Sequence, residues 1–210
     1  MDINQTEEQQ VEAIKKFWQD NGNAIIAGLV IGLGGFIGFN LYQDHKIEQE
    51  TKVADAYQAI VEDAAEDSAT FAEAAKAFIA ENGDSSYVAL TAFALAKTAA
   101  DAKDWVEAEK QLSLAADKAP EEGIKGIALV RLARVLVQQE KYAEALDVLG
   151  KPMPASFVAA VEELKGDVYL AQDKKELARN AYQAALDAEG QSGNQALQMK
   201  LDDLAESVNL

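Results

Sequence analysis

The chain has 210 residues, a net charge of −17, no cysteine and one histidine, His45. This charge balance argues against nucleic-acid binding, because contacts to phosphates require clustered lysine and arginine. Without cysteine or a second histidine, the sequence offers no plausible zinc site and no Ser–His or Cys–His catalytic pair. We therefore expect no enzyme activity, no metal and no cofactor.

Residues 24–42 form an uncharged, strongly apolar stretch. As an α-helix this stretch would be about 28 Å long, which is close to the hydrocarbon thickness of a bilayer. Aromatic residues flank it, with Phe17 and Trp18 before it and Tyr42 at its end, and amphipathic rings favour the headgroup region. The sequence therefore predicts a transmembrane helix over 24–42 rather than a buried core helix.

Residues 1–23 do not resemble a secretory signal peptide. They contain five acidic residues where a basic region is expected, and the apolar stretch that follows is longer than in a signal peptide. We expect the segment to be retained as a short acidic tail with an amphipathic juxtamembrane stretch. Lys15 and Lys16 before the apolar stretch are matched by Lys46 and Lys52 after it, so counting positive charges does not orient the helix.

Four glycines lie on one side of the predicted transmembrane helix: Gly28, Gly32, Gly35 and Gly38. Small residues allow another helix backbone to approach closely, which favours association inside a membrane. Glycine is also common in membrane helices without any such role. The pattern therefore has two interpretations, a helix-packing face or ordinary membrane composition.

The remaining residues, 43–210, are rich in good helix formers and predict an all-α domain. Small residues recur at intervals of 34, 37 and 33 residues, at Ala74, Ala108, Ala145 and Ala178. A second set precedes the last three at Ala96, Ala133 and Gly166. This pattern resembles the tetratricopeptide repeat, in which small residues lie where paired helices cross. We predict about four helix pairs followed by a C-terminal capping helix.

The same register predicts a concave face lined by the first helix of each pair. Six residues occupy matching columns on that face: Phe93, Lys97, Val130, Arg134, Glu163 and Asp167. Lys97 and Arg134 could bind a partner's carboxylate or backbone carbonyls, with Phe93 and Val130 giving apolar contact. The alternative is that Lys97 and Arg134 are ordinary surface cations.

The order of these segments resembles a bacterial family, the ancillary SecYEG translocon subunits. The resemblance lies in the leader and anchor, the repeats and the C-terminal helix: VEAIKKFWQDNGNAIIAGLVIGLGGFIGFNLY, IALVRLARVLVQQEKYAEAL, EELKGDVYLAQDKKELARNAYQAAL and LQMKLDDLA. It implies a single-pass inner-membrane protein with a cytoplasmic N-terminus and periplasmic repeats. It also implies association with the SecYEG channel and with the periplasmic chaperone PpiD.

The function that the resemblance implies is to pass emerging secretory proteins to periplasmic chaperones. The alternative is a scaffold or stress-signalling regulator in the cell envelope that recruits a folded partner and no unfolded client. Both are binding functions and need no catalytic site.

Overall fold

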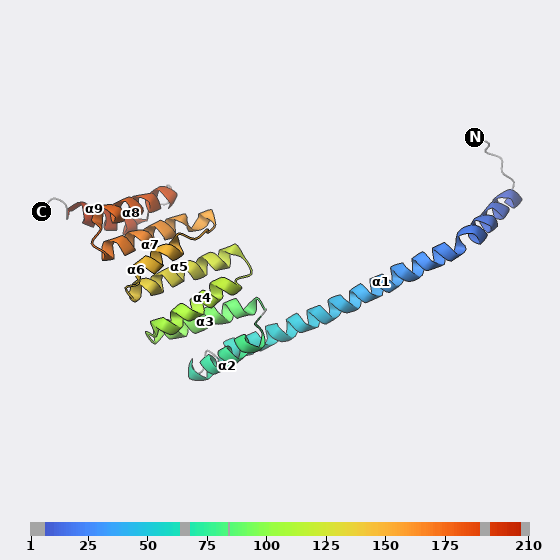
Figure 1. Cartoon of the computed structure of the whole chain (residues 1–210), viewed down its shortest axis with the longest axis horizontal. Coiled ribbons are helices and arrows are strands. Elements are labelled where there is room, and N and C mark those ends of the chain that lie inside the picture. The colour runs from blue at the N-terminus through green and yellow to red at the C-terminus, as the bar shows by residue number, and fades with distance from the viewer. Residues whose placement is uncertain (1–6, 64–67, 84, 190–193, 207–210) are drawn as a thin grey trace. The chain divides into compact units, whose positions relative to one another are not determined.

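The computed structural model describes residues 7–63, 68–83, 85–189 and 194–206 (Figure 1). The described residues form helices joined by turns and contain no strand, which confirms the all-α prediction. The chain divides into two compact units, Met1–Lys52 and Val53–Leu210.

Helix α1 (Glu7–Asp63) contains the predicted transmembrane segment. It begins at Glu7, so the stretch predicted as a short tail is helical from that residue, and residues 1–6 lie outside the described residues. The large apolar side chains between residues 26 and 42 are exposed, and the most apolar part of the helix has no buried residue. By length and composition, α1 can cross a membrane.

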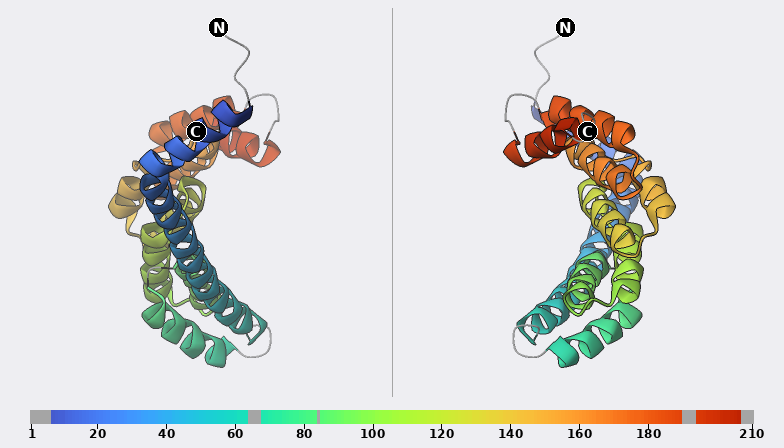
Figure 2. Two further views of the ribbon diagram at one scale, coloured as in Figure 1. Left: turned by 90° about the vertical axis from the view of Figure 1, so that its right-hand side faces the viewer. Right: turned by 90° about the vertical axis from the view of Figure 1, so that its left-hand side faces the viewer.

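The unit Val53–Leu210 is a stack of helix pairs. After the end of α1 come α2 (Ser68–Glu81), α3 (Tyr87–Asp101), α4 (Trp105–Lys118), α5 (Glu122–Gln138), α6 (Tyr142–Leu149), the 3-10 helix η1 (Ala155–Phe157), α7 (Val158–Ala171), α8 (Lys175–Glu189) and α9 (Gln195–Glu206). The helices from α2 to α9 follow one another in chain order along a curve (Figure 2). Helix α5 packs against α4, α6 and α7, so its apolar surface is covered on several sides.

The predicted small residues lie at the crossings of three helix pairs. Ala108, Ala145 and Ala178 are fully buried. In α2, however, the fully buried alanine is Ala75 and not Ala74. The reason is that Ala75 lies on the same side of α2 as Phe71 and Phe78, and these rings pack into the core formed with the end of α1. The predicted register is therefore wrong by one residue in the first pair.

The turn within each of the last three pairs contains a residue in the left-handed conformation: Lys103 (φ 60°), Glu140 (φ 60°) and Asp173 (φ 57°). Two hydrogen bonds close each turn, and in the α5–α6 turn they run from the Glu140 N–H to the Val137 carbonyl and from the Lys141 N–H to the Leu136 carbonyl. This pattern is the Schellman motif, in which glycine is the usual left-handed residue. None of the three positions has glycine.

We expect Glu140→Gly to raise the free energy of unfolding by about 0.5 to 1 kcal/mol. Glycine removes the strain of a Cβ in the left-handed conformation, which is about 1 to 2 kcal/mol. This gain exceeds the additional conformational entropy that glycine loses on folding, which costs about 0.5 to 1 kcal/mol. The control is Gln138→Gly two residues earlier, where the backbone is helical and glycine should instead destabilise by about 1 kcal/mol. Chemical denaturation followed by circular dichroism measures both, and equal effects of the two changes would contradict the prediction.

A polar contact joins the α5–α6 turn to α4 of the preceding pair. Lys141 Nζ and Gln139 Nε2 each donate a hydrogen bond of 2.7 Å to Glu109 Oε2. The hydrogen bond from Lys141 lowers the pKa of Glu109, against the opposing effect of burial and with help from Gln139. A carboxyl with a lowered pKa stabilises the fold above its unfolded pKa and loses that effect as the pH falls.

We therefore expect Glu109→Gln to destabilise the domain at pH 7, because the substitution removes the charge that pairs with Lys141. The expected effect is only about 1 kcal/mol, since both Glu109 and Lys141 are partly exposed. The difference from the unsubstituted protein should shrink as the pH falls below about 4.3, the ordinary pKa of glutamate, and disappear once the pH has passed below the lowered pKa of Glu109 in the folded protein. Glu73→Gln, at an exposed carboxylate on α2, is the control and should change stability little at either pH. A deficit of Glu109→Gln that persists undiminished at low pH would contradict the assignment.

Candidate functional site

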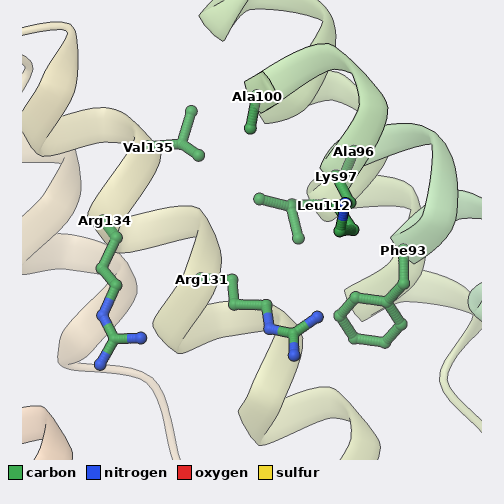
Figure 3. Close-up of a pocket in the computed structure, with 8 residues that line it drawn as sticks. All are labelled: Phe93, Ala96, Lys97, Ala100, Leu112, Arg131, Arg134 and Val135. Carbon is green, nitrogen blue, oxygen red and sulfur yellow. The ribbon is translucent and has the colours of Figure 1, made fainter. Parts of the chain in front are cut away.

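The first helices of two neighbouring pairs, α3 and α5, enclose a cavity of about 330 Å³, which we call the α3–α5 cavity. Figure 3 shows the residues that line it: Phe93, Ala96, Lys97, Ala100, Leu112, Arg131, Arg134 and Val135. Its base is apolar, because Leu112 and Val135 are buried core residues. Its rim carries cations.

Three cations line the α3–α5 cavity. The Arg131 guanidinium lies 5.2 Å from the centre of the Phe93 ring, a cation–π contact that holds both side chains at the rim (Figure 3). Lys97 forms an ion pair of 2.7 Å with Asp101, but both side chains are mostly exposed, and such pairs are weak. Within the described part of the chain, Arg131 and Arg134 form no ion pair with a carboxylate. The cavity therefore has positive charge available for a ligand.

A second cavity of about 400 Å³, the α5–α7 cavity, lies on the next pair of first helices. Trp105, Arg134, Val135, Val137, Gln138, Leu164 and Asp167 line it. Arg134 and Val135 line both cavities, so the two adjoin on α5, and we call the two adjoining cavities the groove. Such a groove suits an extended segment of another polypeptide.

Of the six predicted concave-face residues, Phe93, Lys97 and Arg134 line the α3–α5 cavity together. Val130 does not, because it is buried in the main core with only 6% of its surface exposed. Val130 lies one turn after Gly126, on the same side of α5. The Phe157 ring packs against this side so closely that a Cβ added to Gly126 would lie 2.7 Å from Phe157 Cε2. Val130 is therefore a core residue and cannot offer the predicted apolar contact.

Glu163 and Asp167 lie on α7, but their carboxylates are already engaged by α9. Lys200 Nζ donates to Glu163 Oε1 at 2.8 Å and to Asp167 Oδ1 at 2.7 Å, and the Tyr182 hydroxyl also donates to Asp167 Oδ1 at 2.7 Å. Burial and the bond to Asp167 raise the pKa of Tyr182. Burial opposes the charge on Lys200, but the bonds to Asp167 and Glu163 outweigh it and raise the pKa of Lys200. This pair of carboxylates holds the capping helix, although Asp167 also borders the α5–α7 cavity.

The charged residue of the α3–α5 cavity that is absent from the six predicted residues is Arg131. The repeat spacing predicted Val130 instead, because Val130 lies one repeat of 37 residues after Phe93. A second signal was present in the sequence, since Arg131 and Arg134 are three residues apart and therefore share a helix face. Their shared charge in the otherwise apolar stretch 126–137 indicates the exposed side of α5.

The groove combines positive charge with apolar surface. Its three cations surround an apolar base, and among the described residues no three potential metal ligands lie close together anywhere. Cations beside apolar surface attract a ligand that has both a carboxylate and an apolar group.

The helix stack and the exposed apolar helix define a membrane-anchored tetratricopeptide repeat-like protein. Residues 15–206 match the family model described as a tetratricopeptide repeat-like domain. The chain is 31% identical over 206 residues to the ancillary SecYEG translocon subunit of Escherichia coli strain K12, covering 98% of this chain and 100% of that one. It is 35% identical over 203 residues to the ancillary SecYEG translocon subunit of Neisseria gonorrhoeae, covering 94% and 97% of the two chains. The chain therefore belongs to the family of ancillary SecYEG translocon subunits. No solved structure gives a significant match. The name of these relatives describes an accessory component of the translocon.

Proposed function

We propose that this protein is a membrane-anchored adaptor of the SecYEG translocon that passes emerging secretory proteins to periplasmic chaperones. The observation that carries the proposal is the similarity to ancillary SecYEG translocon subunits along nearly the whole chain, from the apolar helix to the capping helix. In this proposal the N-terminus is cytoplasmic, the helix pairs are periplasmic, and the periplasmic chaperone PpiD is a partner.

The groove supports such a role physically. A binding surface tethered next to a protein-conducting pore meets emerging chains at an effective concentration of roughly millimolar, so weak contacts are sufficient. An open groove with an apolar base and charged rim provides weak contacts to many sequences. The negative charge of the rest of the surface opposes aggregation with partly unfolded clients.

The test is site-specific photo-crosslinking in cells that are secreting protein. A photo-reactive residue at position 97, on the rim of the α3–α5 cavity, should crosslink to many different secretory chains, and the signal should fall when protein synthesis stops. The same residue at position 110, which is exposed on α4 outside both cavities, is the control and should give few such products. A single stoichiometric partner from position 97, unchanged when secretion stops, would support the envelope scaffold or stress-signalling regulator and contradict the adaptor.

We further propose that the glycine face of α1, formed by Gly28, Gly32, Gly35 and Gly38, packs against a transmembrane helix of the translocon. A Cβ added at any of these glycines meets no atom of the described chain within 4 Å, so the face is open to a partner. Gly32→Leu should reduce copurification with SecYEG several-fold, because the added side chain separates the backbones. Ile31→Leu is the matched control, and equal recovery of the channel with both variants would contradict the packing face and leave the glycines as ordinary membrane composition.

A further inference from the structure

The rim of the α3–α5 cavity is positively charged, although the chain as a whole is strongly negative. The protein carries a net charge of −17, yet the rim of this cavity has Lys97, Arg131 and Arg134. Ionic screening limits the reach of exposed charges to about 8 Å at physiological salt. A ligand in the cavity therefore responds mainly to these three cations and to Asp101, which pairs with Lys97, so the local charge remains positive. The remote acidic surface nevertheless disfavours a broad anionic surface such as a lipid headgroup layer. The charge pattern therefore selects a local anionic group.

The cavity also has an apolar component at fixed positions. Leu112 and Val135 form its base, and the half-buried Phe93 ring forms one wall. The contact between Arg131 and this ring orients the guanidinium along the apolar wall (Figure 3). A ligand that fills the cavity thus places an apolar group on Phe93 and Leu112 while its anionic group lies within reach of Arg131 and Arg134.

We propose that the α3–α5 cavity binds short polypeptide segments in which a carboxylate lies next to an apolar side chain, an inference that rests on the proposed adaptor function and names its client chemistry. The carboxylate accepts hydrogen bonds from the two guanidinium groups, which suit planar two-oxygen acceptors. The apolar side chain enters the cavity of about 330 Å³, which is at the small end of ordinary ligand pockets. The carboxylate can belong to an aspartate, a glutamate or a free C-terminus.

The test uses the full chain in a non-ionic detergent and three fluorescein-labelled eight-residue peptides. The first has adjacent leucine and glutamate and an amidated C-terminus, the second has glutamine in place of the glutamate, and the third has the glutamine with a free C-terminal carboxylate beside the leucine. Fluorescence anisotropy should show that the glutamine amide binds about tenfold more weakly than the glutamate peptide. Tight binding of the third peptide identifies a terminal carboxylate as an additional source.

Arg131→Gln and Arg134→Gln should each weaken binding of the glutamate peptide about tenfold and leave the glutamine amide unchanged. Lys110→Gln removes one positive charge from an exposed site on α4 outside the cavity and is the matched control, with an expected change below twofold. Both arginines are exposed, and unchanged circular dichroism shows that the variants are folded.

Equal binding of the glutamate peptide and the glutamine amide would overturn the proposal, as would equal effects of Arg134→Gln and Lys110→Gln. Absence of binding to every peptide at about 1 mM, the effective concentration near the pore, would also overturn it. These results are distinguishable from failure of the adaptor function itself. If photo-crosslinks to many secretory chains persist while the peptides show no dependence on acid, the adaptor function stands and only the carboxylate chemistry is wrong.

Discussion

Gly166→Ala is expected to lower the free energy of unfolding by about 2 kcal/mol. Gly166 lies on α7, and a Cβ added there would overlap the ring atoms Cδ1 and Cε1 of Tyr182 on α8. The ring cannot move aside easily, because Tyr182 is fully buried and its hydroxyl is bonded to Asp167. Overpacking of this kind costs about 1 to 3 kcal/mol or more, which outweighs the gain of up to about 1 kcal/mol when alanine replaces glycine in a helix.

Gly123→Ala is the matched control for this change. Gly123 is also helical, but an added Cβ there meets no atom within 4 Å, so the substitution should stabilise the protein slightly. In a Tyr182→Leu background, the cost of Gly166→Ala should fall by more than about 1 kcal/mol, since residues in contact are energetically coupled. Chemical denaturation of the unsubstituted protein, Gly166→Ala, Tyr182→Leu and the double variant measures this coupling. A cost of Gly166→Ala that is independent of residue 182 would contradict the close approach of α7 and α8.

The second large effect concerns the apolar part of α1. Introducing two charges, Ile31→Arg with Leu33→Arg, is expected to release most of the protein from the membrane. Each arginine near the centre of a transmembrane helix costs about 2.5 to 3.5 kcal/mol on insertion scales, so the pair costs about 5 to 7 kcal/mol. Ile31 and Leu33 are 74% and 59% exposed, so the charges are not accommodated by packing within the chain.

The control places the same two charges at the same spacing outside the apolar stretch, as Gln49→Arg with Thr51→Arg in the same helix. This variant should remain in the membrane pellet after alkaline extraction, whereas the Ile31→Arg, Leu33→Arg variant should appear largely in the supernatant. Equal retention of both variants would mean that α1 does not cross the hydrocarbon core.

The sequence predicted the architecture well because each helix pair repeats the same packing problem. A small residue is needed where two helices cross, and Ala108, Ala145 and Ala178 satisfy this need at spacings that the sequence alone reveals. Asp104, predicted as the N-cap of α4, does accept a hydrogen bond from the Glu107 backbone N–H at 3.1 Å. Local rules of spacing and capping were therefore sufficient for the helices and their order.

The groove was harder to predict because it depends on contacts between repeats. A shift of one residue exchanges a core position for an exposed one, as Val130 and Arg131 show. The role of Glu163 depends on Lys200, which is 37 residues away in the capping helix and has no counterpart in the repeat pattern. Irregular elements decide these positions, and a periodic alignment contains no information about them.

The measurement that tests the central claim most directly is protease digestion of intact spheroplasts. The proposed function requires that one helix anchor the protein in the inner membrane and that the helix pairs from α2 to α9 face the periplasm. It predicts that added protease removes this repeat domain from intact spheroplasts and leaves a membrane-protected fragment containing residues 24–42. Digestion of the repeat domain only after lysis would place it in the cytoplasm and contradict a role in receiving exported chains.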